Sequence, residues 1–136
     1  MVVLYHYTCD HGRAALGGQA EVLPIWALLA RSMRTDQIPP VANFSWFTDL
    51  ASPQRKALGL TSNILKCDRT MHRYRVVPEA EKRCAWWMDV RDRVDEEIRR
   101  NLESVAGVKP GHWWVATMPV AVFYDPVRAD VEQVVS

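Results

Sequence analysis

The chain has 136 residues, and this length predicts one domain over residues 1–136. Hydrophobic residues make up 49% of the chain and charged residues 24%, which is typical of a globular protein and excludes a disordered or fibrous one. Because the net charge is only +1, bulk electrostatics favours neither a nucleic-acid scaffold nor a membrane-surface protein.

The first predicted element is a strand over residues 2–8, where apolar and aromatic residues alternate at period two. Residues two apart share a face of a strand, so His6 lies with Leu4 and Thr8. A turn-forming segment follows at residues 9–12, and polar groups at strand ends are common ligand-binding positions. His6 is therefore a candidate site residue, although a lone histidine is more often a hydrogen-bonded core residue.

An aromatic strand is predicted over residues 44–50, with Trp46 and Thr48 on one face and Phe47 and Asp49 on the other. Before it we expect short helices at residues 11–16 and 24–33, then a surface loop over residues 35–43. A short helix over residues 54–58 should follow, because Ser52 can cap it. Thr48 and Asp49 therefore have an ordinary structural explanation, as the end of a strand before a capped helix.

The second half predicts a strand over residues 72–77, which places Arg73 and Arg75 together on one face. One long amphipathic helix is predicted over residues 87–105, because apolar residues recur there at intervals of three and four. Two strands follow at residues 112–117 and 120–124, and the adjacent Trp113 and Trp114 must lie on opposite faces of the first. The order of elements predicts an α+β fold with one long helix and several short ones.

The cysteine and histidine spacings do not favour a metal centre. The pairs Cys9-x-His11 and Cys67-x4-His72 lack the spacing of zinc sites, so no metal is expected. A cysteine nucleophile at Cys9 stays open as an alternative. Three cysteines without a CxxC spacing indicate free thiols, and no apolar run is long enough for a membrane helix, so we expect a cytoplasmic protein without a membrane partner.

The order of three strands resembles the ADP-ribosyltransferase fold, found in diphtheria-toxin-like transferases, poly(ADP-ribose) polymerases, DarT-type DNA-modifying toxins and tRNA 2′-phosphotransferases. Leu4-Tyr5-His6-Tyr7-Thr8 looks like the opening strand of that fold. Trp46-Phe47-Thr48-Asp49 looks like its second motif, and residues 112–115 followed by 120–124 occupy the place of its third. The resemblance implies a split mixed or antiparallel sheet and NAD as the substrate.

The resemblance also implies roles for individual residues. His6 would orient the nicotinamide ribose, and Trp46 or Phe47 would stack on the nicotinamide. His112 stands where the family has its catalytic glutamate, and an imidazole does not supply the same negative charge. Glu103 is a remote substitute. The implied catalytic residues are His6 and His112, and the implied NAD-binding residues are Tyr7, Thr8, Trp46, Phe47, Thr48, Arg73, Arg75 and Trp113.

The expected function is transfer of ADP-ribose from NAD to a macromolecular acceptor, nucleic acid or protein, in a phage, toxin or anti-defence setting. The acceptor would enter over the loop at residues 35–43. One alternative is a non-catalytic binding module on the same fold, which the missing glutamate motivates. Another is a phosphate-ester transferase or RNA-processing domain, because Arg73 and Arg75 could bind phosphate in a bidentate manner.

Overall fold

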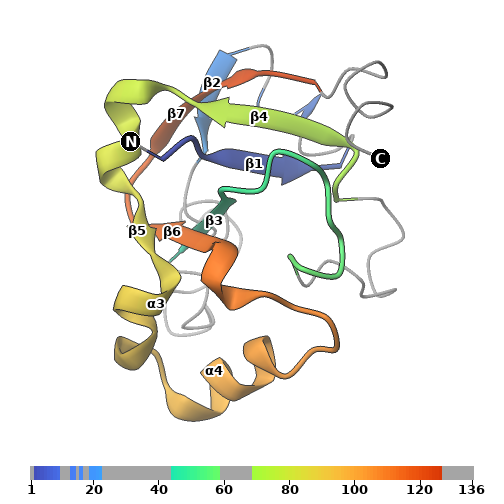
Figure 1. Ribbon diagram of the computed structural model, residues 1–136. Coiled ribbons are helices and arrows are strands. Elements are labelled where there is room, and N and C mark those ends of the chain that lie inside the picture. Colours follow the sequence, from blue (N-terminus) through green and yellow to red (C-terminus); the bar gives the residue numbers. More distant parts are fainter. Residues whose placement is uncertain are drawn as a thin grey trace.

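A computed structural model describes residues 2–9, 13, 14, 16, 19–22, 44–58 and 69–126. Within these residues one sheet is accompanied by several short helical segments, an α+β arrangement as expected (Figure 1). The seven strands are β1 (Tyr5–Thr8), β2 (Gln19–Val22), β3 (Ser45–Thr48), β4 (His72–Val76), β5 (Ala85–Trp86), β6 (Trp113–Ala116) and β7 (Val120–Tyr124). The helical segments are η3 (Pro78–Arg83), α3 (Trp87–Val90), η4 (Arg91–Arg93), α4 (Glu96–Glu103) and η5 (Pro110–His112).

The strand order is β2-β7-β4-β1-β3-β6-β5, and every described pair of neighbours is antiparallel. The strand predicted over residues 120–124 is confirmed with the same bounds, and those over residues 44–50, 72–77 and 112–117 are confirmed with slightly shorter bounds. Strand β2 was not expected from the sequence. The helix predicted over residues 24–33 and the loop over residues 35–43 lie outside the described residues.

The sheet must curl, because β6 and β7 are joined by only three residues, 117–119. In the strand order β7 and β6 are four steps apart, which in a flat sheet is about 19 Å at roughly 4.8 Å per step. A three-residue link reaches at most about 14 Å between its flanking residues. Curling brings the end of β6 next to the start of β7 and encloses one face of the sheet.

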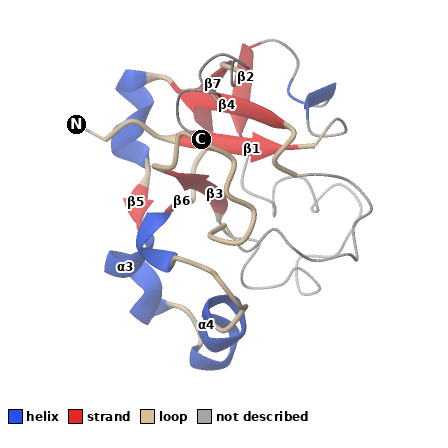
Figure 2. Ribbon diagram, turned by 45° about the vertical axis from the view of Figure 1, so that its right-hand side comes forward, coloured by secondary structure: helices blue, strands red, loops and turns tan. Residues whose placement is uncertain are grey.

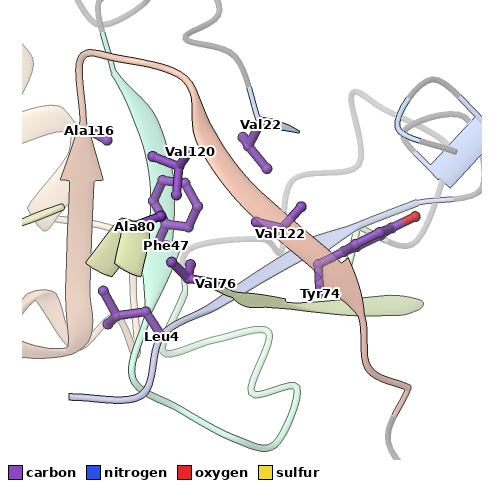
Figure 3. Packing of buried hydrophobic residues seen from close by; sticks show 9 residues of the cluster. All are labelled: Leu4, Val22, Phe47, Tyr74, Val76, Ala80, Ala116, Val120 and Val122. Carbon is purple, nitrogen blue, oxygen red and sulfur yellow. The ribbon is translucent and has the colours of Figure 1, made fainter. Parts of the chain in front are cut away.

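The enclosed face holds the larger of two hydrophobic clusters, which we call the sheet core (Figure 3). It draws residues from both ends of the strand order, as the curl requires. Its buried members are Leu4, Val22, Phe47, Tyr74, Val76, Ala80, Ala116, Val120 and Val122.

The opposite face of β3 and β6 holds the second cluster, which we call the tryptophan core. Its buried members are Trp87, Trp113 and Val115, and Phe44 and Trp46 pack against them. The rings of Trp46 and Trp113 are perpendicular with centroids 5.9 Å apart, a favourable edge-to-face geometry. Trp114 packs instead against the sheet core, so the prediction that the two adjacent tryptophans face opposite ways is confirmed.

The prediction of one long helix over residues 87–105 is wrong. The chain forms α3, η4 and α4 in turn, and the backbone is extended at Val94 (ψ 141°) and Asp95 (ψ 134°) (Figure 1). The carboxylate of Asp95 accepts a hydrogen bond of 3.0 Å from the Glu97 amide, so Asp95 caps a new helix. Val94 and Leu102 still pack on the tryptophan core, which explains why the apolar period survives the break.

The helix expected over residues 54–58 is reduced to one turn, with Leu58 N donating to Gln54 O at 3.1 Å. Both α3 and α4 lie beyond the β3–β6–β5 end of the sheet (Figure 2). Within the described part of the chain, no helix has the length and apolar character that crossing a membrane requires.

Candidate functional site

The step between β1 and β3 is where the sheet is least tightly paired. β1 pairs with β4 through four residues in register, but with β3 through Tyr5 and Thr48 only. Next to this single pair, Nδ1 of His6 lies 2.8 Å from the carbonyl oxygen of Trp46. A side chain therefore supplies a hydrogen bond between β1 and β3 where the backbone ladder supplies few.

The hydrogen bond fixes the tautomer of His6. A carbonyl oxygen only accepts, so Nδ1 carries the hydrogen and Nε2 of the neutral ring keeps its lone pair. Burial lowers the pKa of His6, because desolvation disfavours the charged ring, and the bond to Trp46 opposes this by a smaller amount. The ring centroid of Phe47 lies 5.5 Å away. His6 is thus a neutral hydrogen-bond acceptor beside an apolar ring.

His112, at the end of η5, forms a close pair with Asp49, just after β3. His112 Nδ1 lies 2.6 Å from Asp49 Oδ1, and Trp114 Nε1 donates to Asp49 Oδ2 at 3.4 Å. The His112 side chain is 43% exposed and the Asp49 side chain 29% exposed. A carboxylate therefore stands directly behind the imidazole at the position where the resemblance placed a glutamate.

The backbone around this pair is fixed by hydrogen bonds from other elements. Thr48 Oγ1 donates to the His112 carbonyl at 2.7 Å and accepts from the Leu50 amide at 3.2 Å. Trp86 Nε1 donates to the carbonyl of Gly111 at 2.8 Å. The backbone on both sides of the pair is thus held in place by partners distant in sequence, and this preorganises the two side chains.

Sheet register relates His6 to the Asp49–His112 pair. Tyr5 pairs with Thr48 in antiparallel register, so His6 stands level with Phe47, and Phe47 is the register partner of Trp114. Asp49 is two residues beyond Phe47 and so belongs to the same face. His6 of β1 and Trp114 of β6 thus lie on one face of the sheet, and only β3 separates their strands.

Six of the eight predicted NAD-binding residues lie on the face opposite His6, because strand alternation and register place Tyr7, Arg73 and Arg75 there together with Trp46, Thr48 and Trp113. Trp46 packs in the tryptophan core with its ring centroid 5.2 Å from that of Trp87. Trp113 is 5% exposed, and its Nε1 donates to the Ala57 carbonyl at 3.0 Å. Of the two rings considered for stacking on nicotinamide, only Phe47 shares a face with His6 and contacts its ring.

Tyr7 and Thr8 continue β1 beyond His6. The Tyr7 hydroxyl donates to the Leu50 carbonyl at 2.8 Å, which ties β1 to the residue that follows Asp49. Burial raises the pKa of Tyr7, so its phenol stays protonated. Thr8 is half-buried and pairs with His72.

Arg73 is occupied by protein groups. It forms an ion pair with Asp125 at 3.2 Å, donates from Nη1 to the Ala51 carbonyl at 2.6 Å, and lies over the Tyr5 ring at 4.8 Å. Arg75 differs, because its buried Nε has no hydrogen-bond partner within the described residues. A phosphate would have to compete for Arg73 with contacts that hold the end of β7 to β4.

Glu103 does not reach the candidate site. It accepts from Arg91 Nη2 at 2.6 Å and from Trp87 Nε1 at 2.7 Å, beside the tryptophan core. The hydrogen bond from Arg91 lowers the pKa of Glu103, which keeps it ionised. Glu103 therefore forms an ion pair with Arg91 that joins α4 to η4. Among the described residues, no group of three or more His, Cys, Asp and Glu is placed to hold a metal ion.

The sequence indicated His112 but not the two residues that complete its surroundings, Asp49 and Trp114. Asp49 had an ordinary explanation at a strand end, and 63 residues separate it from His112. Only the pairing of Thr48 with Trp113 brings them together. No protein-family model, curated protein or solved structure matches this chain.

Proposed function

We propose that this chain binds NAD beside the β1–β3 step and transfers ADP-ribose to a macromolecular acceptor, nucleic acid or protein, on an ADP-ribosyltransferase-like fold. The observation that supports this most is that His6 of the opening strand and His112 before β6 lie on one face, with Phe47 between their strands. The resemblance in sequence required these motifs to converge, although they are about a hundred residues apart in the chain.

His6 has the chemistry that holding a ribose requires. Its Nδ1 is used by Trp46, and its lowered pKa keeps the ring neutral with a lone pair on Nε2, the kind of acceptor that a sugar hydroxyl bonds. Phe47 contacts the His6 ring but is only 4% exposed in the sheet core, so the nicotinamide ring would meet no more than the edge of this side chain. When NAD is bound, it supplies a ribose carbon that becomes electrophilic as the nicotinamide bond lengthens, and the protein contributes chiefly orientation and electrostatics.

The missing glutamate is offset by Asp49. Its carboxylate lies 2.6 Å behind Nδ1 of His112, so the pair together places negative charge at this end of the sheet. A developing positive charge on the ribose would be stabilised by that charge. This supports catalysis over binding without turnover.

A binding module without catalysis is the second candidate, because several of the implied contacts are already used in packing. Phe47, Thr48 and Trp113 are all buried, and the donors of Arg73 are held by Asp125 and Ala51. Turnover separates the two candidates. A protein that captures a partner but neither hydrolyses NAD nor labels any macromolecule in an extract is a binding module.

The test of NAD binding is calorimetric titration of the wild type and of His6→Asn. An asparagine amide can donate to the Trp46 carbonyl as Nδ1 does, but it lacks the Nε2 acceptor, so the sheet should survive while NAD binding weakens. The matched control is His72→Asn on β4, where Nδ1 meets the Tyr124 hydroxyl at 3.0 Å, and binding should persist. Absence of binding heat with the wild type would overturn the proposal.

A further inference from the structure

The Asp49–His112 pair has the arrangement of a general base with its positioning carboxylate. A carboxylate only accepts hydrogen bonds, so at 2.6 Å it is Nδ1 of His112 that donates to Oδ1. In the neutral ring this leaves the lone pair on Nε2. The His112 side chain keeps 43% of its surface exposed, so packing covers only part of it.

The pair differs from an incidental surface ion pair in how it is held. The second carboxylate oxygen of Asp49 accepts from the indole N–H of Trp114 at 3.4 Å. Both oxygens therefore accept a hydrogen bond, one from His112 and one from Trp114. Thr48 fixes the carbonyl of His112 at 2.7 Å, and Trp86 fixes the preceding carbonyl, of Gly111. A mobile surface pair gains little from such surroundings, whereas a base must be held in one geometry before its substrate arrives.

We propose that His112 is the base that deprotonates the acceptor, a hydroxyl or amide nucleophile, and that Asp49 is its positioning residue. This inference rests on the proposed function for the reaction, but the geometry of the pair does not depend on it. Asp49 fixes the imidazole tautomer and stabilises the imidazolium that forms. Trp114 in turn orients Asp49.

With a hydroxyl acceptor, one bond forms and one bond breaks at the ribose carbon of NAD. The proton of the O–H group moves to Nε2 of His112 as the oxygen forms a bond to the ribose carbon of NAD. The bond from that carbon to the nicotinamide nitrogen breaks, and its electron pair stays with nicotinamide, which leaves as a neutral molecule. The imidazolium, paired with ionised Asp49, then releases its proton to water.

The experiment combines two readouts on Asp49→Ala, Asp49→Asn and the control Glu96→Gln, whose carboxylate forms an exposed pair with Arg100 within α4. The first is the tautomer of His112, followed by ¹⁵N NMR of histidine-labelled protein at a pH that keeps the ring neutral. The wild type should hold the hydrogen on Nδ1. Asp49→Ala should move the population toward the Nε2–H form, and Glu96→Gln should leave it unchanged.

The second readout is the rate of ADP-ribosyl transfer with NAD saturating. Loss of positioned general-base catalysis lowers a rate by about 10²- to 10⁴-fold, so kcat should fall in that range in both Asp49 variants while the KM for NAD stays near the wild-type value. Asp49→Asn keeps the size and shape of the side chain, so it is less prone to disturb folding. The ¹H–¹⁵N spectrum of each variant shows whether it is folded. Glu96→Gln should transfer at the wild-type rate.

The outcomes separate the two proposals. Wild-type transfer by both Asp49 variants would overturn the base assignment and leave NAD binding intact. An unchanged His112 tautomer in Asp49→Ala would overturn the pairing itself, whatever the reaction. Failure of the wild type to bind NAD would overturn the proposed function and, with it, this reaction for His112, while the tautomer readout would still decide whether Asp49 positions the ring.

Discussion

Two carboxylates in this protein have similar partners and different consequences. Glu103 accepts from the guanidinium of Arg91 and the indole of Trp87, and Asp49 meets the imidazole of His112 and the indole of Trp114. A guanidinium stays protonated in proteins, so the first group can only hold charge in place. A neutral imidazole keeps a lone pair on one nitrogen, so the second group has the atoms that proton transfer requires.

The same contrast separates the adjacent Trp113 and Trp114. Trp113 is buried and gives its indole N–H to a backbone carbonyl, whereas Trp114 is half-buried and gives its N–H to a carboxylate. An abundance of aromatic residues therefore does not locate the site. The candidate site is distinguished by an indole N–H, of Trp114, that donates to a carboxylate next to the partly exposed imidazole of His112.

The largest effect on stability should come from the tryptophan core, which lies beside Glu103. Trp87 is fully buried in the tryptophan core, so Trp87→Ala should cost about 3–5 kcal/mol in the free energy of unfolding, the range for large aromatic truncations. Urea unfolding followed by circular dichroism measures this. The neighbouring Trp86, which is 39% exposed, is the matched control, and Trp86→Ala should cost well under half as much. Equal losses would contradict the assignment of the core.

Glu103→Gln should come next, because it removes the charge that Arg91 and Trp87 surround. The hydrogen bond from Arg91 lowers the pKa of Glu103 in the folded state. Its contribution is therefore present above the unfolded pKa and is lost as pH falls through the folded pKa. Unfolding free energies measured across the acidic range should fall less steeply in Glu103→Gln than in the wild type. Parallel profiles would show that Glu103 does not couple to folding.

Tyr7→Phe is expected to have a smaller effect. It removes the hydroxyl that donates to the Leu50 carbonyl and leaves that carbonyl without this partner, at a cost of about 1 kcal/mol. Tyr5→Phe is the control on the same strand face. Thermal and urea unfolding of both variants would measure the difference, and a loss in Tyr5→Phe as large as that in Tyr7→Phe would argue against the role of this bond.

The smallest effect on stability should come from Asp49→Asn. The side chains of Asp49 and His112 are 29% and 43% exposed, and ion pairs near solvent contribute about 0–1 kcal/mol. We therefore expect an unfolding midpoint close to the wild-type value, together with the loss of transfer described above. Strong destabilisation of this variant would show that Asp49, like Glu103, chiefly stabilises the fold.

The sequence predicted the parts of the fold that depend on local pattern. Alternation located β1, β3, β4, β6 and β7, because each strand has one face in a core. The break at Val94 and Asp95 was missed because both helical pieces pack on the same cluster, so the apolar period continues across it. Nothing local indicated that β2 pairs with β7.

The candidate site was predictable only in part, for a related reason. His6 and His112 could be found because each belongs to a short sequence motif, His6 within β1 and His112 at the end of η5 directly before β6. The Asp49 partner is set by the register of β3 against β6, which no single segment encodes. The faces of Trp46 and Phe47 follow from alternation, but which of the two rings shares a face with His6 depends on the register of β1 against β3.

The most direct test of the central claim is to titrate NAD into histidine-¹⁵N-labelled protein and follow the imidazole signals, assigned through His6→Asn and His112→Asn. If one NAD molecule occupies the face that both residues share, the His6 and His112 signals should move together over the same range of NAD concentration. Saturating NAD that moves neither signal, or only one of them, would contradict a common nucleotide site on this face.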